Sequence, residues 1–331
     1  MSQRVTILGD GAMATVCSIL LDHNGHDLTM WGAFPDAIER LRGNREQTRL
    51  LPGVRVPERV RLVADDAEAL RCADIAVLAV PTQHLRSVCA RLKPHVPASL
   101  PIVSVAKGIE LETSLTPSQV IGAVLGGSNP LCVLSGPNIA GEIARRLPAS
   151  AVASSSDAAL ARRVQQLFST GWFRVYTNAD PRGVEIAAAT KNVIALAAGM
   201  LDGLGAGNNA KAALVTRGLV EISRLGVALG GCAETFAGLA GLGDLVTTCI
   251  SPEGRNRHVG ERLGRGEKLD DILASLSSVV EGVPTTRAVV ALARSKDVSM
   301  PIAEQVLAVL FEGKDVSLAL SELMSRDLKP E

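Results

Sequence analysis

The amino-acid sequence predicts an α/β protein in which a mostly parallel sheet comes first and an all-helical region follows. Three observations predict this fold class. A glycine-rich turn separates an apolar strand from an apolar helix within residues 5–21. Strand-like and helix-like segments then alternate up to about residue 180, which is typical of parallel strands joined by helices. Strand signals stop there, so we expect domains at residues 1–180 and 181–331.

The expected strands of the first domain are short, and several are apolar throughout. Such strands are typical of a sheet that is covered by helices on both faces. They lie at residues 4–8, 27–31, 75–80, 102–106, 131–134, 151–154 and 173–176. Helix-like segments between them include residues 35–42, 83–92 and 157–168.

The second domain is expected to consist of helices rich in Ala and Leu. The segments lie at residues 184–201, 210–229, 270–278, 285–294 and 302–311. Glycine clusters at residues 203–207 and 238–243 separate some of them.

Composition excludes several functional classes. The 331 residues contain 34 Lys plus Arg and 34 Asp plus Glu, so the formal net charge is zero and we expect no nucleic-acid partner. Aromatic residues make up only 2% of the chain, too few for base-stacking platforms. The apolar content of 47% is ample for a core, but no uninterrupted apolar run approaches a membrane span, so we expect no membrane insertion.

The cysteines indicate a reducing compartment. None forms a C-x-x-C pair and most lie in apolar runs, which favours buried thiols over disulfides or a metal site. The chain starts with a strand rather than a signal peptide, so a cytoplasmic location is expected. The six are Cys17, Cys72, Cys89, Cys132, Cys232 and Cys249.

The glycine-rich turn matches a dinucleotide fingerprint in its G-x-G-x-x-A form. Gly9 permits the tight turn, Gly11 lets a pyrophosphate approach the backbone, and Ala14 lets the helix pack closely on the strand. The pyrophosphate would lie on free N–H groups at the helix N-terminus. We therefore expect a Rossmann-type domain that binds NAD or NADP.

A lysine follows the fourth expected strand. In open α/β sheets, ligands bind outside the carboxyl ends of the strands. Lys107 comes directly after the apolar run 102–106, and Gly136 and Asn138 follow the next strand. These residues are candidates for a ligand site, with a solvated lysine in a turn as the alternative.

A second lysine interrupts an apolar helix. Lys191 and Asn192 lie in the segment 184–196, which is apolar almost all round and should be buried. Buried polar groups need partners or a cavity, and we expect burial to lower the pKa of Lys191 toward acid–base chemistry. The alternative is a lysine that extends to the surface.

A third cluster combines glycines with charged residues. Asp244 follows Gly241-Leu242-Gly243, and Arg255 and Asn256 are expected near the start of a helix that ends around Leu263. An arginine beside helix N–H groups suits a phosphate, with a solvated basic turn as the alternative.

Together these segments resemble the bacterial NAD(P)-dependent glycerol-3-phosphate dehydrogenases, from Val5 to about Phe311. The order and spacing of eight motifs carry the resemblance. They are Val105-Ala106-Lys107-Gly108, Ser135-Gly136-Pro137, Lys191-Asn192-Val193-Ile194-Ala195, Asn208-Asn209-Ala210-Lys211, Thr216-Arg217-Gly218-Leu219, Ala240-Gly241-Leu242-Gly243-Asp244-Leu245, Arg255-Asn256-Arg257 and Val280-Glu281-Gly282.

The resemblance implies reduction of dihydroxyacetone phosphate, a phosphorylated triose, to sn-glycerol 3-phosphate for phospholipid synthesis. It implies that Lys191 is the proton donor, with Lys107 and Asp244 in the catalytic set, and that no metal takes part. The implied substrate contacts are Lys107, Gly136, Asn138, Asn192, Asp244, Gly254, Arg255 and Asn256. The implied cofactor contacts are Gly9, Gly11, Ala12, Met13, Ala33, Phe34, Lys107, Ala140, Arg255, Val279 and Glu281.

The chain departs from the family pattern mainly around the cofactor. Ala12 and Met13 stand where the family has Ser and an aromatic residue, and Asp10 stands where it has Ala. Asn138 replaces Ser or Thr, and Gly254 replaces Ser.

The segment after the second expected strand bears on the choice of cofactor. The residues after Trp31 are Gly32-Ala33-Phe34-Pro35, where the family carries Arg or His and NAD enzymes carry Asp or Glu. Asp36 comes too late, because Pro35 starts a helix. We expect both NADH and NADPH to work, with a preference within roughly two decades, or about 3 kcal/mol.

Two other functions remain open at this point. A related two-domain reductase of a hydroxy acid or a ketopantoate-like substrate would share the domain order. A non-catalytic NAD(P)-sensing protein would bind the cofactor without turnover. The oligomeric state is open as well, with a homodimer as one candidate.

Overall fold

The computed structural model describes residues 2–276 and 279–328. They form two compact units. The first contains the residues up to Glu110 and the segment Leu115–Glu185, and the second contains Leu111–Ser114 and the residues from Ile186 onward. The expected boundary at 180/181 lies close to this division and stays a prediction.

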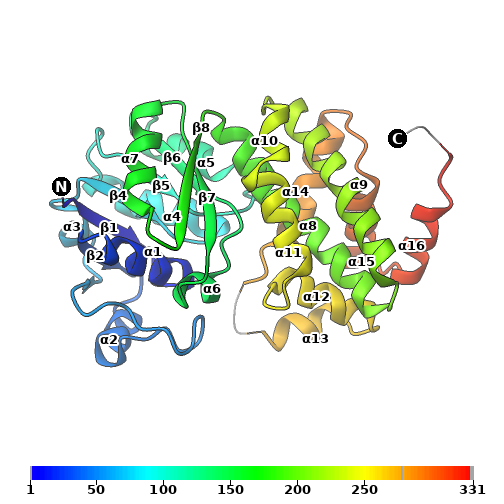
Figure 1. The fold of residues 1–331 in the computed structure, drawn as a ribbon, viewed down its shortest axis with the longest axis horizontal. Helices are drawn as coiled ribbons and strands as arrows, with labels where there is room; N and C mark the ends of the chain where they lie inside the picture. Colours follow the sequence, from blue (N-terminus) through cyan, green and yellow to red (C-terminus); the bar gives the residue numbers. More distant parts are fainter. Residues whose placement is uncertain (1, 277–278, 329–331) are drawn as a thin grey trace. The chain divides into compact units, whose positions relative to one another are not determined.

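The first unit is built on an eight-stranded sheet (Figure 1). The strand order is β3-β2-β1-β4-β5-β6-β7-β8, and all neighbouring strands are parallel except β6 and β7. Both halves of the sheet grow outward from β1 and β4, as in doubly wound nucleotide-binding folds. The strands are β1 (Arg4–Leu8), β2 (Asp27–Trp31), β3 (Arg61–Val63), β4 (Ile75–Leu78), β5 (Ile102–Ser104), β6 (Leu131–Ser135), β7 (Ala149–Ser154) and β8 (Phe173–Asn178).

Helices cover both faces of this sheet, which explains why several of its strands, such as β4 and β5, are buried along their whole length. One core packs side chains of α1, α2, α6 and α7 on the sheet, and the other packs those of α3, α4 and α5. The helices are α1 (Ala12–His23), α2 (Pro35–Asn44), α3 (Asp66–Leu70), α4 (Thr82–Leu92), α5 (Pro117–Leu125), α6 (Ala140–Ala144) and α7 (Ala158–Phe168), with a 3₁₀ turn, η1 (Lys93–His95).

Local sequence determines where several of these helices begin and end. Thr116 forms a capping box with Gln119 at the start of α5, and Gly126 ends that helix in a left-handed conformation. Asp157 caps α7 by accepting hydrogen bonds from the N–H groups of Ala159 and Leu160.

The second unit is helical. Every regular element in the described chain after Asn178 is a helix, as predicted. The elements are α8 (Pro181–Gly203), which begins in the first unit, α9 (Gly207–Ala228), α10 (Ala233–Ala237), a π-helical turn η2 (Leu239–Gly243), α11 (Asp244–Ile250), α12 (Arg255–Gly264), α13 (Leu269–Ala274), α14 (Gly282–Ser295), α15 (Pro301–Phe311) and α16 (Val316–Met324).

Helix α8 is the centre of the second unit. Its length and apolarity would suffice for a membrane span, but its most apolar 18-residue stretch is entirely buried, so it is a core helix. Close packing depends on small residues: a Cβ on Gly260 of α12 would lie 2.0 Å from the Leu196 carbonyl oxygen, and one on Gly199 would lie as close to Arg257.

The α/β fold class and the mostly parallel sheet are confirmed, and some elements differ from expectation. Strands 4–8 and 27–31 lie where predicted. The sequence analysis missed β3, which has three residues, and the helices α3, α5, α6, α10, α11 and α16. The helix expected at 270–278 is α13, which ends at Ala274, and residues 277–278 lie outside the described residues.

Candidate functional site

The turn after β1 fits a dinucleotide. Gly9 has a φ of +128°, and a Cβ there would lie 2.5 Å from the Ala79 carbonyl oxygen, so only glycine suits the position. Gly11 is the N-cap of α1 and has no side-chain capping bond. The first N–H groups of the helix, those of Ala12, Met13 and Ala14, have no intrahelical acceptor, as at any helix start. This cradle of N–H groups suits a pyrophosphate.

The residues after β2 border the same edge of the sheet. Gly32 is buried, Ala33 is half-buried and Phe34 is 72% exposed. Arg91 of α4 donates to the Ala33 carbonyl at 2.8 Å and lies over the Trp31 ring at 5.1 Å. Phe34 therefore presents an apolar ring at the edge where the fold would hold the adenosine end of the cofactor.

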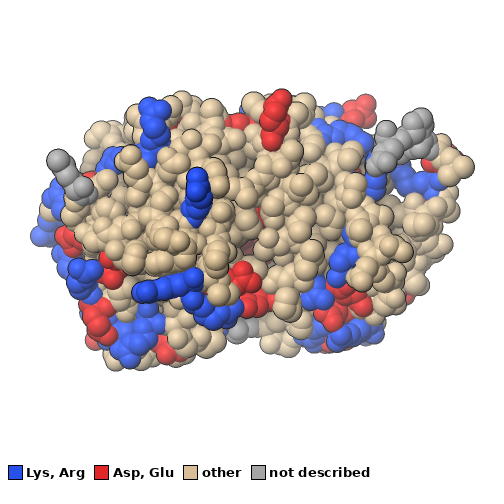
Figure 2. All heavy atoms as spheres, in the orientation of Figure 1, with Lys and Arg blue, Asp and Glu red and all other residues tan. Residues whose placement is uncertain are grey.

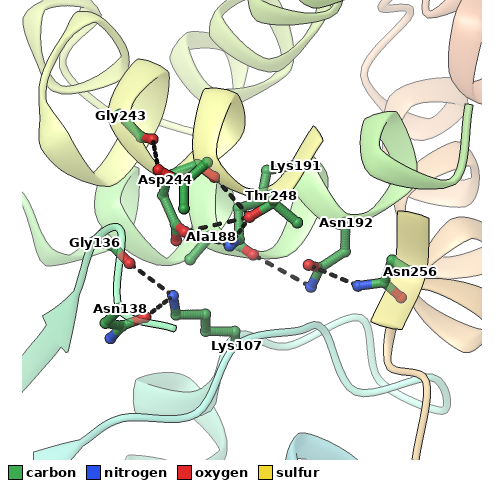
Figure 3. A network of polar contacts seen from close by, with 11 residues as sticks. Lys107, Gly136, Asn138, Ala188, Lys191, Asn192, Gly243, Asp244, Thr248 and Asn256 are labelled. Atoms are coloured by element: carbon green, nitrogen blue, oxygen red, sulfur yellow. Dashed lines mark hydrogen bonds and ion pairs between the residues drawn. The ribbon is translucent and has the colours of Figure 1, made fainter. Parts of the chain in front are cut away.

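Lys107 is held by groups that follow β6. Its Nζ donates to the Gly136 carbonyl at 3.0 Å and to Asn138 Oδ1 at 2.6 Å (Figure 3). Gly136 has a φ of +144°, and a Cβ there would lie 2.9 Å from Ala151 Cα. The predicted neighbours Lys107, Gly136 and Asn138 thus come together at the carboxyl ends of β5 and β6.

Lys191 is buried and paired. Its Nζ donates to Asp244 Oδ1 at 2.5 Å and to Thr248 Oγ1 at 2.6 Å (Figure 3). The Lys191 and Asp244 side chains are only 6% and 3% exposed. Asp244 is the first residue of α11, directly after η2, and a Cβ on Gly241 of that turn would lie 2.0 Å from the Phe236 carbonyl oxygen. Glycine at position 241 therefore lets the turn that leads into Asp244 pack tightly against α10.

Asn192 and Asn256 form a second pair beside it. Asn256 Nδ2 donates to Asn192 Oδ1 at 3.0 Å (Figure 3). The Gly282 N–H donates to Asn256 Oδ1 at 3.0 Å. A Cβ on Gly282 would lie 2.5 Å from that oxygen, so glycine is needed there. Both amide side chains are thereby fixed in orientation.

The remaining predicted residues of the second unit lie around the start of α12. Arg255 is the first residue of that helix and is exposed, and its guanidinium donates to the Val279 carbonyl at 3.0 Å. Gly254 is the N-cap, where a Cβ would lie 3.1 Å from the Thr248 carbonyl oxygen. Glu281 is the N-cap of α14. An exposed guanidinium at a helix start can bind a phosphate group.

Ala140 of the first unit begins α6 and packs against the core that includes α1. It therefore lies on a helix that packs against α1, the helix that follows the fingerprint turn. Among the described residues, no group of three or more His, Cys, Asp or Glu side chains is placed to hold a metal ion.

Thr248 was missed by the sequence analysis. It lies four residues after Asp244 in α11, so both side chains share one face of the helix. That spacing was available as a signal once Asp244 was singled out. Thr248 Oγ1 also donates to the Asp244 carbonyl at 2.6 Å, which fixes the hydroxyl hydrogen and leaves the oxygen to accept from Lys191.

Charges on the surface are mixed. On the face in Figure 2, Lys and Arg side chains and Asp and Glu side chains lie in small groups, with broad areas of other residues between them. Inside the second unit, the buried charges of Lys191 and Asp244 pair with each other.

Comparison with known proteins agrees with this geometry. Residues 4–161 match the family model described as NAD-dependent glycerol-3-phosphate dehydrogenase N-terminus, and residues 180–321 match the model of its C-terminus. The chain is 46% identical over 329 residues to a protein of Chlorobium limicola named glycerol-3-phosphate dehydrogenase [NAD(P)+], which covers 99% of both chains. A Geobacter sulfurreducens protein of the same name is 46% identical over 333 residues, with 100% of this chain and 99% of the relative covered.

Solved structures show the same fold. The crystal structure of glycerol-3-phosphate dehydrogenase from Coxiella burnetii matches 98% of this chain and 99% of its own, with a TM-score of 0.94 and 34% identity. A ketopantoate reductase from Ralstonia eutropha matches 97% of this chain and 99% of its own, with a TM-score of 0.60 and 15% identity. The latter likeness shows the fold alone.

Proposed function

Because this chain belongs to the NAD-dependent glycerol-3-phosphate dehydrogenase family, we propose that it interconverts dihydroxyacetone phosphate and sn-glycerol 3-phosphate with NADH or NADPH. The observation that carries the proposal is the buried pair of Lys191 and Asp244. A cation buried in an apolar helix and held by a carboxylate and a hydroxyl suits a proton donor in a ketone reduction.

Lys191 is the proposed general acid. When bound, the reduced nicotinamide supplies the hydride to the C2 carbonyl carbon. Negative charge then develops on the carbonyl oxygen, and an N–H of the Lys191 ammonium stabilises it and delivers the proton that makes the C2 hydroxyl. In the reverse direction Nζ accepts that proton.

Asp244 and Thr248 support the lysine. The carboxylate balances the charge of Lys191, and the two acceptors at 2.5 and 2.6 Å fix the direction of Nζ. A fixed donor does not need to reorganise when charge develops on the substrate.

Phosphate binding is the proposed role of the start of α12. Arg255 supplies positive charge there, and the oriented Asn256 amide supplies a fixed polar group. Binding energy at the phosphate, remote from the ketone, positions C2 for reaction. We propose substrate contacts in the first unit as well, by Lys107, Gly136 and Asn138. The proposal rests on the family resemblance and on the two hydrogen bonds that Lys107 donates to Gly136 and Asn138.

We propose that the turn at Gly9–Gly11 binds the cofactor, with the N–H groups at the start of α1 holding its pyrophosphate. Further proposed cofactor contacts in the first unit are Ala33, Phe34 and Ala140. Those in the second unit are Arg255, Val279 and Glu281. The activity supplies glycerol 3-phosphate for phospholipid synthesis, and we propose a cytoplasmic location for it.

One assay tests the proposal. Purified protein should oxidise NADH and NADPH when dihydroxyacetone phosphate is added and should not do so without it, followed at the dihydronicotinamide absorbance. Turnover with ketopantoate but not with dihydroxyacetone phosphate would favour the carboxylate reductase. Cofactor binding without turnover of any substrate would favour a sensor.

A further inference from the structure

Asp10 belongs to the turn after β1, but its carboxyl group lies at the end of β2. Gly32 directly follows β2, and a Cβ on Gly32 would lie 3.2 Å from Asp10 Cγ and 2.6 Å from Ile38 Cδ1. The Asp10 side chain therefore fills part of the space that a side chain at position 32 would need. The strands bring the two residues together, because the Gly9 N–H donates to the Trp31 carbonyl at 2.8 Å.

The end of the second strand decides cofactor choice in sheets of this type. NAD enzymes place Asp or Glu there, about 20 residues after the glycine motif, to bind the 2′-hydroxyl of the adenosine ribose. Gly32 occupies that place here and cannot do so. We propose that Asp10 supplies the carboxylate from the neighbouring strand, accepts a hydrogen bond from the ribose 2′-hydroxyl, and makes the protein prefer NADH to NADPH.

The inference rests on the proposed function, since it assumes a nucleotide on the Gly9–Gly11 turn, and the turn fits one. The Asp10 backbone is fixed, because Gln47 Nε2 donates to the Asp10 carbonyl at 2.7 Å. Within the described chain, the Asp10 carboxylate accepts a hydrogen bond from its own N–H and from no other residue. The carboxylate therefore has capacity for a ligand hydroxyl.

Two guanidinium groups lie in this region, and they differ in availability. Arg91 is occupied: it donates to both carboxylate oxygens of Asp66 at 2.7 Å and to the Ala33 carbonyl. Arg40 is exposed and acts on Asp10 through its charge. A 2′-phosphate would bring negative charge beside the half-buried Asp10 carboxylate, where a low local dielectric strengthens the repulsion.

The test compares ligand pairs that differ only in the 2′-phosphate. Binding of NADH and NADPH is followed by dihydronicotinamide fluorescence, and binding of ADP-ribose and its 2′-phosphate by calorimetry. Wild type should bind the unphosphorylated member of each pair at least about tenfold more tightly, and Asp10→Asn, which keeps the shape and removes the charge, should bring the ratio to within about threefold. Asp36→Asn, an exposed carboxylate in the first turn of α2, is the matched control and should leave the ratio unchanged.

The outcomes are distinct. The role of Asp10 is overturned if Asp10→Asn and Asp10→Ala both keep the wild-type affinity ratio between the unphosphorylated and phosphorylated ligands, at unchanged melting temperature. It is also overturned if that ratio changes in Asp36→Asn and not in the Asp10 variants. Wild-type preference for the phosphorylated ligands overturns it as well. Failure of wild type to bind any of the four ligands overturns the proposed function itself. A ratio that shrinks as salt is raised supports an effect of charge.

Discussion

The Nζ atom of Lys191 and the Oδ1 atom of Asp244 lie 2.5 Å apart, although the two residues are 53 positions apart in the chain. Both side chains are almost completely buried. Removing one member of such a pair leaves an uncompensated charge inside the protein, which costs about 3–5 kcal/mol. Both residues therefore bear on stability as well as on turnover, and tests of either need a measure of folding.

The first prediction concerns Lys191. Lys191→Met should bind NADH normally and lose about two to four decades of turnover, as expected for loss of a general acid. Calorimetric melting and NADH binding check that the protein is folded. Lys296→Met, a change at an exposed lysine, is the control and should be fully active. Near-normal turnover of Lys191→Met would remove Lys191 from the mechanism.

The second concerns Thr248. Thr248→Val removes an acceptor of Lys191 and should lower kcat about tenfold with little change in KM, because a hydrogen bond to a charged group contributes about 1.5–3 kcal/mol. Thr248→Ser keeps the hydroxyl and should recover most of the activity. Equal rates in Thr248→Val and wild type would show that Asp244 alone suffices to hold Nζ.

The third concerns the phosphate. Dihydroxyacetone should be a very poor substrate, since it lacks the remote binding energy. Arg255→Ala should lower kcat/KM for dihydroxyacetone phosphate far more than for dihydroxyacetone, whereas Arg265→Ala, at the other end of α12, should affect neither. Losses of equal size on both substrates would mean that Arg255 does not bind phosphate.

The fourth concerns pH and stability. Glu221 of α9 accepts hydrogen bonds from the N–H groups of Ile302 and Ala303 at the start of α15, yet burial raises its pKa to about 7 from the ordinary 4.5. Arg224 opposes this rise and Glu304 adds to it. The folded protein holds the proton more tightly than the unfolded chain, so stability should fall as pH rises from about 4.5 to 7.

The full contribution of Glu221 to the free energy of unfolding would be about 3 kcal/mol, since one pKa unit corresponds to about 1.4 kcal/mol. The pH dependence of melting measures it. Wild type should lose several degrees more than Glu221→Gln between pH 5 and pH 8. Parallel curves for the two proteins would show that Glu221 titrates in the same range folded and unfolded.

The fifth concerns the cofactor ratio. Both NADH and NADPH should support turnover, with kcat/KM values within roughly two decades. Ala33→Arg should shift the ratio toward NADPH, because a guanidinium at the end of β2 can bind a 2′-phosphate. A thousandfold preference of wild type in either direction would mean that further residues recognise the ribose.

Much of the fold and of the candidate site could be predicted because the signals are local. Three features within 20 residues specify β1, the turn and α1. They are the apolar run Val5–Leu8, the glycines at positions 9 and 11, and the apolar helical segment that follows. Lys191 stands out because a charge inside an apolar helix needs a partner. The strand β3 escaped prediction because three residues give too little periodicity to separate a strand from a loop.

What the sequence by itself determined is therefore the order of most strands, the change from alternating to helical structure and the residues able to do chemistry. Only the tertiary structure decided which of them meet. The pairing of β1 with β2 carries the Asp10 carboxyl to Gly32, and the packing of α11 on α8 brings Asp244 and Thr248 to Lys191. Contacts of this kind join residues 22 to 57 positions apart, and no local pattern specifies them, because they depend on which faces of the elements are buried together.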